Sequence, residues 1–179
     1  MKKNLVFIFF VAQAFSMVAQ TIDSEQSTIT FLVSNFRVRT VEGIISDMKG
    51  TAQFDTDNLE ASRFDVSLPV ATINTENDKR DTHLKSEDFF EVDTYPTISF
   101  ISKEISKTPK GLFVSGDLTI KDVTKGVEIP FTESKEGNLQ ILEGSISIKR
   151  RDYNVGEGTS NFMVGNEIRV KIRCVVSGG

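Results

Sequence analysis

The sequence predicts an all-β protein, an antiparallel up-and-down barrel of about eight strands with one short helix at its side. Apolar and polar residues alternate through most of the chain after residue 20, which is typical of strands with one buried face. Short runs of turn-forming residues separate these segments, and short connections favour antiparallel neighbours. Helical spacing is scarce. A sheet of this size must then bury one face against itself, as a barrel or a sandwich, and we favour the barrel.

The alternating segments follow one another along the chain, and each has one apolar face. Turn chemistry separates them at residues 55–58, 108–111, 135–138 and 156–158. In chain order, the residues that share a face are Ile29, Phe31 and Val33; Phe64, Val66, Leu68 and Val70; Ile98 and Phe100; Leu112, Val114, Gly116, Leu118 and Ile120; Val127, Ile129 and Phe131; Ile146 and Ile148; and Ile168, Val170, Ile172, Cys174 and Val176.

The alternation stops between residues 75 and 95. Residues 76–84 predict a short helix, because acidic residues occupy its first turn, where they interact favourably with the helix dipole. This is the one helix that the pattern supports.

The first 20 residues predict a secretory signal peptide. Lys2 and Lys3 precede an apolar run from Leu5 to Phe15, and the segment contains no acidic residue. The run is shorter than the roughly 20 residues that span a bilayer. We expect cleavage between residues 16 and 20, one barrel domain over residues 21–179, and a periplasmic or secreted protein.

Charge and cysteine content narrow the function classes. The chain has a net charge of −4, and loss of Lys2 and Lys3 would change it to −6, which argues against a nucleic-acid binder. The single cysteine, Cys174, excludes an intramolecular disulfide, so packing must stabilise the domain.

The interior of an eight-stranded barrel is either filled by side chains or holds one elongated ligand. Alternation alone favours a filled core, since inward phenylalanines are normally packing residues. In the ligand-binding alternative an apolar lumen is walled by Phe31, Val33, Phe54, Phe64, Val66, Leu68, Ile98, Phe100, Leu118, Ile120, Ile129, Phe131, Ile146, Ile148, Ile168 and Val170.

The segment from Arg80 to Phe100 carries the most distinctive motif. It reads RDTHLKSEDFFEVDTYPTISF and resembles the pattern RDxHLxSxDFFxVxxYPxIxF of the YceI-like family. Further matches follow in family order, from Gly43 to Asp55, at 116–125 and at 151–156. The resemblance covers nearly all of the chain after the predicted signal peptide.

This resemblance implies a lipocalin-like barrel with a tunnel that binds a polyisoprenoid or similar long-chain lipid, and no catalytic activity. No cofactor is implied; an isoprenoid quinone or another lipid would be a bound ligand. Ile45 and Met48 stand where the family often has aromatic residues, which would change the shape of the tunnel.

Three basic residues are candidates for the mouth of the lumen. Arg80 and His83, one helical turn apart, could meet a lipid head group. Arg151, in the basic run 149–151, could meet an anionic head group or make a transient membrane contact. Structural roles are the stronger interpretation: Arg80 and Asp81 tie down the helix, His83 caps or packs, and the basic run is a solvated strand end.

Enzyme chemistry has little support. One histidine and one cysteine cannot assemble an imidazole-rich or thiolate zinc site, and no G-x-S-x-G motif surrounds a serine. We therefore expect no metal and no catalysis. A structural or interaction barrel with a filled core is the alternative. An outer-membrane barrel is disfavoured by two tyrosines and no tryptophan, where aromatic girdles are expected. The residues do not predict the oligomeric state.

Overall fold

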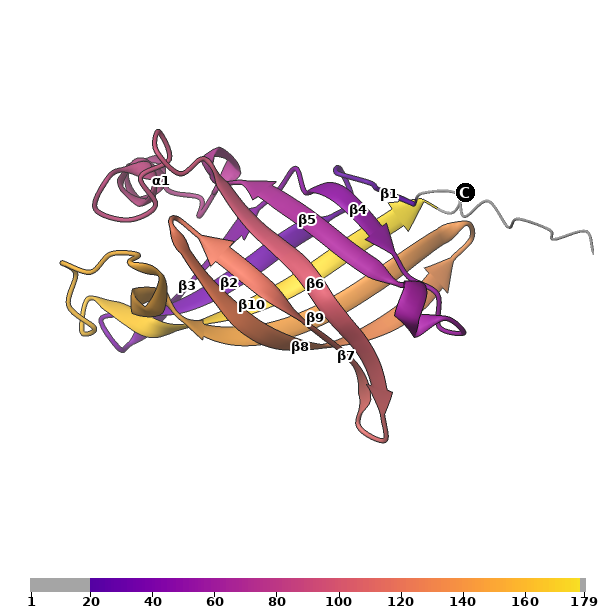
Figure 1. Cartoon of the computed structure of the whole chain (residues 1–179). Coiled ribbons are helices and arrows are strands. Elements are labelled where there is room, and N and C mark those ends of the chain that lie inside the picture. The colour runs from indigo at the N-terminus through magenta and orange to yellow at the C-terminus, as the bar shows by residue number, and fades with distance from the viewer. Residues whose placement is uncertain (1–19, 178–179) are drawn as a thin grey trace, which may run out of the picture.

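The computed structural model describes residues 20–177, which form a closed antiparallel barrel (Figure 1). The strands are β1 (Thr21–Ile22), β2 (Thr28–Asn35), β3 (Arg39–Ile45), β4 (Lys49–Gln53), β5 (Arg63–Pro69), β6 (Thr97–Thr108), β7 (Gly111–Ile120), β8 (Val123–Glu136), β9 (Leu139–Lys149) and β10 (Val164–Ser177). The helix is α1 (Asp78–Lys85), and the 3-10 helices are η1 (Leu59–Ala61), η2 (Val70–Thr72) and η3 (Arg150–Tyr153). The predicted signal peptide lies outside the described residues, apart from Gln20.

The ten strand segments close into an eight-stranded barrel. The sheet order is β1-β4-β5-β6-β7-β8-β9-β10-β2-β3, and β1 also pairs with β10. β1 and β2 both lie beside β10 and together occupy one strand position of the barrel. β4 lies beside β1 and β3 lies beside β2, so β3 and β4 together occupy the next position. Because the pairings form a ring, the barrel leaves no long open edge. The predicted fold class is confirmed.

The period-2 pattern locates most of the strands, because alternate side chains point to opposite faces of a sheet. Each predicted segment falls within a strand, except that Val70 begins η2. The strands β1, β3 and β4 were not predicted. β4 reads KGTAQ, with a single buried apolar residue, Ala52, and therefore has no apolar alternation to detect.

The helix α1 begins two residues later than the predicted 76–84. The side chain of Asn77 accepts a hydrogen bond from the backbone N–H of Arg80 at 2.9 Å and caps the first turn. The helix ends at Lys85, and the C-cap residue Ser86 has an extended backbone. In Figure 1, α1 lies at the same end of the barrel as η3, away from η1 and the C-terminal end of β10.

The end of the barrel near η1 is closed by an aromatic cluster. Phe54, which follows β4, meets Phe131 edge to face with ring centroids 5.3 Å apart. Phe64 completes the cluster, at 6.2 Å from Phe54 and 5.9 Å from Phe131. Close by on β10, Val176 is fully buried. This end of the barrel is solid.

Candidate functional site

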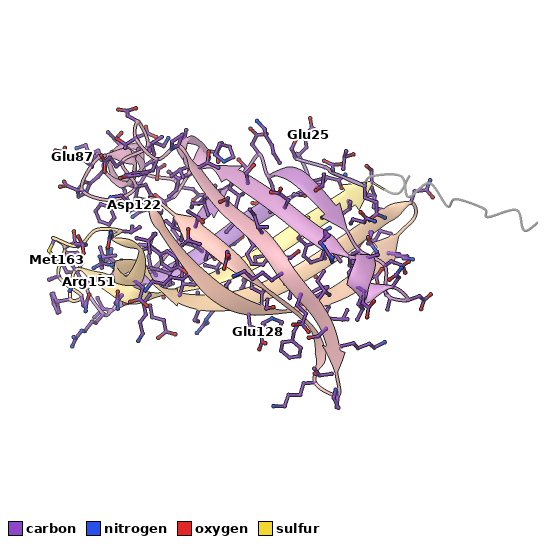
Figure 2. All side chains as sticks on the ribbon, viewed as in Figure 1. Glu25, Glu87, Asp122, Glu128, Arg151 and Met163 are labelled. Carbon is purple, nitrogen blue, oxygen red and sulfur yellow. The ribbon has the colours of Figure 1, made fainter. Side chains whose placement is uncertain are left out.

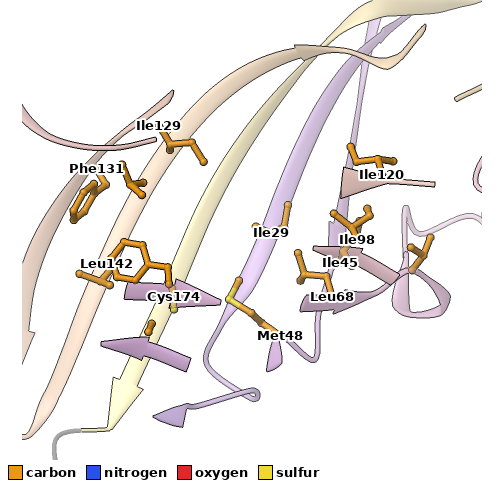
Figure 3. Packing of buried hydrophobic residues seen from close by; sticks show 14 of the residues in the cluster. Ile29, Ile45, Met48, Leu68, Ile98, Ile120, Ile129, Phe131, Leu142 and Cys174 are labelled. Atoms are coloured by element: carbon orange, nitrogen blue, oxygen red, sulfur yellow. The ribbon is translucent and has the colours of Figure 1, made fainter. Parts of the chain in front are cut away.

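The interior of the barrel contains a cavity of about 230 Å³. Its wall is built from the apolar faces of the strands, because every second side chain on each strand points inward. Figure 3 shows Ile29 on β2, Met48 in the connection between β3 and β4, and Cys174 on β10 reaching into this interior. Among the residues that line the cavity within 20–177, the polar side chains are those of Ser99, Arg150 and Tyr153.

The structure places fifteen of the sixteen predicted wall residues on the cavity. They are Phe31, Val33, Phe64, Val66, Leu68, Ile98, Phe100, Leu118, Ile120, Ile129, Phe131, Ile146, Ile148, Ile168 and Val170. The exception is Phe54, which is buried in the aromatic cluster at the closed end and does not line the cavity. Phe54 follows the end of a strand, where alternation no longer gives the direction of a side chain. That the wall residues bind a ligand stays a prediction.

The inward side chains are tightly packed at one end of the barrel and border empty space at the other. On β10, Val176 is 0% and Cys174 6% exposed, whereas Ile172, Val170 and Ile168 are half-buried although they point inward. Their remaining exposure is to the lumen. The hollow part of the barrel therefore lies in the half next to α1 and η3.

The segment around α1 contributes apolar residues to the hollow end. Leu84 from the helix, and Phe89 and Phe90 from the turn after it, line the cavity. Phe89 is 4% exposed and Phe90 is half-buried. The sequence pattern does not identify these residues as lining residues. Their side chains point into the lumen because of the way this segment packs against the barrel.

Some lining residues could have been found from the pattern. Ile29, Val114, Ile172 and Cys174 share strand faces with the predicted wall residues and do line the cavity. Others, such as Tyr153 in η3, carry no such signal.

The basic run 149–151 is not simply a solvated strand end, as the sequence suggested. Lys149 and Arg151 are exposed, but Arg150 is 4% exposed and reaches the cavity. Burial, with a smaller contribution from neighbouring Arg151, lowers the pKa of the Arg150 guanidinium. The strand ends at Lys149 and η3 begins at Arg150, so strand alternation does not apply at this point.

The guanidinium of Arg150 is satisfied by the backbone of the loop that precedes β10. It donates hydrogen bonds to the carbonyl oxygens of Val155 at 2.8 Å, Gly156, Thr159 at 2.8 Å, Val164 at 3.1 Å and Gly165 at 3.1 Å. Because all five N–H groups of the fork find acceptors, Arg150 holds this loop in place over the hollow end.

The predicted mouth residues Arg80, His83 and Arg151 do not line the cavity. Arg80 donates to Thr75 through Nε–Oγ1 and Nη2–O hydrogen bonds, both 2.7 Å. Thr75 also donates to Asp81, whose Oδ1 accepts the Thr75 backbone N–H at 3.0 Å. These contacts tie α1 to the segment after η2.

His83 and Arg151 lie on the surface. The Nε2 atom of His83 is 3.1 Å from Oδ2 of Asp88, and its ring meets Phe89 edge to face at 5.0 Å. Arg151 donates from Nη2 to the carbonyl oxygen of Thr159 at 2.9 Å. Both side chains therefore make structural contacts in this conformation.

Neither a cluster of metal ligands nor an activated cysteine is present in the described part of the chain. Within residues 20–177, no three His, Cys, Asp or Glu side chains come together in a way that could hold a metal ion. Burial raises the pKa of the Cys174 thiol to about 12, so this cysteine is a poor nucleophile. None of the described helices has the length and apolar character needed to cross a membrane.

Comparison with known proteins gives relatives over most of the chain. A UPF0312 protein from Photorhabdus laumondii is 31% identical over 139 residues, which are 74% of this chain and 72% of the relative. The crystal structure of BcnA from Burkholderia cenocepacia aligns with a TM-score of 0.79 and 25% identity, covering 86% of this chain and 98% of that one. Neither name describes an enzymatic activity.

A more distant structure shares the fold. A domain from Saccharophagus degradans, described as a polyisoprenoid-binding domain implicated in plant cell wall breakdown, aligns with a TM-score of 0.70 and 15% identity, over 91% of this chain and all of that one. The model of the YceI-like domain matches residues 20–176. The chain therefore belongs to the YceI-like family.

Proposed function

We propose that the protein binds a long-chain isoprenoid or a lipid of similar shape in its lumen, and stores or carries it without catalysing a reaction. One observation carries the proposal: the barrel surrounds a cavity of about 230 Å³ with a wall that is apolar almost throughout. A filled structural barrel, the alternative, has no need of a hollow interior.

The size of the cavity suits a hydrocarbon chain. One water molecule, which is one heavy atom, needs roughly 10–15 Å³ of cavity volume. The cavity therefore has room for on the order of fifteen heavy atoms. Each methylene that leaves water contributes about 0.8 kcal/mol, before the cost of ordering the chain is deducted. Several isoprene units would therefore bind through apolar contact alone.

The two ends of the barrel would set the orientation of the ligand. The surface that the wall presents to the lumen is apolar, so the wall itself offers no partner for a polar head group. The end near η1 is closed by aromatic packing and would receive the chain tail. A polar head group would then lie at the hollow end, beside α1 and η3.

One structural relative supports the choice of ligand class. The Saccharophagus degradans domain is described as polyisoprenoid-binding, and we take isoprenoids as the first class to test. Such a lipid would be cargo, and the proposal requires no cofactor. Lys2, Lys3 and the apolar run after them support a site of action in the periplasm or outside the cell.

Mass spectrometry of organic extracts tests the proposal. Protein purified without detergent should release one class of long-chain lipid in roughly stoichiometric amount. An equal amount of the heat-unfolded and washed protein serves as the blank. Repeated preparations that arrive empty, and that refuse an added isoprenoid, would overturn the proposal and leave the structural barrel.

A further inference from the structure

Large apolar side chains are exposed at the hollow end of the barrel. They belong to Phe36 and Val38, in the β2–β3 turn, and to Phe162 and Met163, in the loop before β10; their exposed fractions are 47%, 81%, 56% and 48%. We call these four residues the rim patch. Figure 2 labels Met163 and Arg151 at this end of the barrel. Isolated exposed apolar residues are ordinary, but a group from two segments is not.

The two segments of the rim patch are joined. The backbone N–H of Phe36 donates to the carbonyl oxygen of Met163 at 3.1 Å, and the rings of Phe36 and Phe162 meet edge to face at 5.9 Å. Phe36 and Arg37 have φ values of 48° and 57°, a turn conformation that asparagine and glycine adopt with much less strain. An aromatic and a basic residue thus occupy the tip of a turn that ordinarily takes small polar residues.

The charged residues in the two segments that carry the rim patch are basic. Residues 35–40 and 159–166 contain Arg37 and Arg39 and no acidic residue, although the whole chain has a net charge of −4. Both arginines are exposed. Arg151 contacts the second segment through its hydrogen bond to the carbonyl oxygen of Thr159. Exposed aromatic and apolar groups beside arginines are complementary to the interface of an anionic bilayer.

Acidic residues gather on another part of the same end. Glu87, Asp88, Asp122 and Glu157 lie around a surface cleft with Lys121, beside α1 and the β7–β8 turn. Figure 2 labels Glu87 and Asp122 there, apart from Met163. An anionic surface would attract the rim patch and repel the acidic cleft, which would set one orientation of the barrel.

The rim patch also borders the lumen. Val164, next to Met163, and Val33, three residues before Phe36, both line the cavity. Val164 pairs with Asn35 at the ends of their strands. A hydrocarbon chain that leaves the hollow end here would meet the rim patch before it met water.

We propose that the rim patch docks the hollow end of the barrel on an anionic phospholipid bilayer, so that an apolar ligand passes between lumen and membrane. Docking itself rests on Phe36, Phe162 and the two arginines; the passage of ligand rests on the proposed function.

Co-sedimentation with vesicles tests the docking step. Vesicles of phosphatidylethanolamine with phosphatidylglycerol are compared with vesicles of phosphatidylcholine alone. The unmodified protein should bind the anionic vesicles, and added salt should weaken binding. The double variant Phe36→Ser with Phe162→Ser should bind at least about tenfold more weakly, and Arg37→Gln with Arg39→Gln should lose roughly fivefold per arginine on anionic vesicles.

Matched controls lie elsewhere on the barrel. Ile101→Ser removes an apolar side chain that is 54% exposed on β6, and Lys107→Gln with Lys110→Gln removes two charges near the β6–β7 turn. Both control variants should bind like the unmodified protein. Equal weakening by controls and patch variants would overturn the proposal, as would absence of vesicle binding. A dimer in solution that the Phe36 and Phe162 substitutions dissociate would also overturn it, by assigning the patch to a second copy.

Lipid extraction from the same preparations separates the two proposals. Loaded protein that ignores vesicles overturns docking and leaves the lipid-binding function standing. Empty protein that binds anionic vesicles through the rim patch overturns the function and supports docking. Patch variants that keep their extracted lipid but lose vesicle binding support both.

Discussion

The buried guanidinium of Arg150 donates a hydrogen bond of 2.8 Å to the carbonyl oxygen of Val155, five residues further along the chain. The same fork reaches Val164 and Gly165 at the start of β10. One side chain thus fastens the loop that carries half of the rim patch. The position of that loop over the lumen depends on this contact.

Arg150→Met should lower the free energy of unfolding by about 3 kcal/mol or more, because several buried carbonyl groups lose a charged donor. Urea denaturation measures the change. Arg151→Met is the matched control, and its exposed side chain should cost less than about 1 kcal/mol. Equal losses in the two variants would contradict the role of Arg150.

Gly156 tests the packing of the same loop. Its φ is 63°, and a Cβ atom would lie 2.7 Å from Cε1 of Phe89 and 2.9 Å from Nη1 of Arg150. Gly156→Ala should therefore destabilise the protein by about 2 kcal/mol or more. Gly158→Ala, where a Cβ atom meets nothing within 4 Å, should stay within about 0.5 kcal/mol of the unmodified protein. Thermal unfolding of both variants measures the two changes in stability. A Gly156→Ala variant as stable as the unmodified protein would contradict close packing at Gly156.

A bulky residue in the hollow part of the lumen should displace the ligand. Ile146 is half-buried on the cavity wall, whereas its neighbour Ser147 is exposed on the outer face. Ile146→Trp should keep the β-sheet circular dichroism spectrum, because the hollow end has room for the ring, but should cut the extracted lipid several-fold. Ser147→Trp should load normally. If Ile146→Trp is folded and carries as much lipid as the control, Ile146 does not contact the ligand.

The thiol of Cys174 should be unreactive in the folded protein. Burial raises its pKa to about 12, so at pH 8 the thiol is protonated as well as inaccessible, and a thiol reagent should label it only in denaturant. In a Cys174→Ala background, Ser177→Cys places an exposed thiol on the same strand and should react at once. Rapid labelling of native Cys174 would show that this part of the lumen is open.

The same pKa predicts a pH dependence of stability. The pKa of Cys174 in the folded protein lies above the ordinary thiol value of 9.0, so the folded state favours the neutral thiol. This contribution is complete below about pH 9 and is lost as the pH rises towards 12. Urea titrations across that range should show the loss, and Cys174→Ala should reduce it. An identical pH profile in Cys174→Ala would mean that other groups cause the loss.

The alternation of the chain by itself determined most of the strands and most of the inward-facing wall, and it favoured a barrel over a sandwich. Residues two apart on a strand, such as Ile146 and Ile148, face the same side of the sheet. This periodicity is a local property of an extended backbone. The net result is a wall that can be assigned from spacing, before any long-range contact is known. The Arg80 to Phe100 motif likewise predicted the family from residue identity alone.

The ends of the barrel were decided only by the tertiary structure. Phe54 lies past the end of a strand and Arg150 lies where a strand becomes a 3-10 helix, so neither direction follows from alternation. Phe54 joins the aromatic cluster, and Arg150 turns inward because carbonyl groups 5 to 15 residues further along the chain accept its hydrogen bonds. Whether the lumen is hollow depends on how strand tilt and closure set its width against the volume of the inward side chains. A periodic pattern carries no information about how the width of the lumen compares with the volume of the side chains inside it.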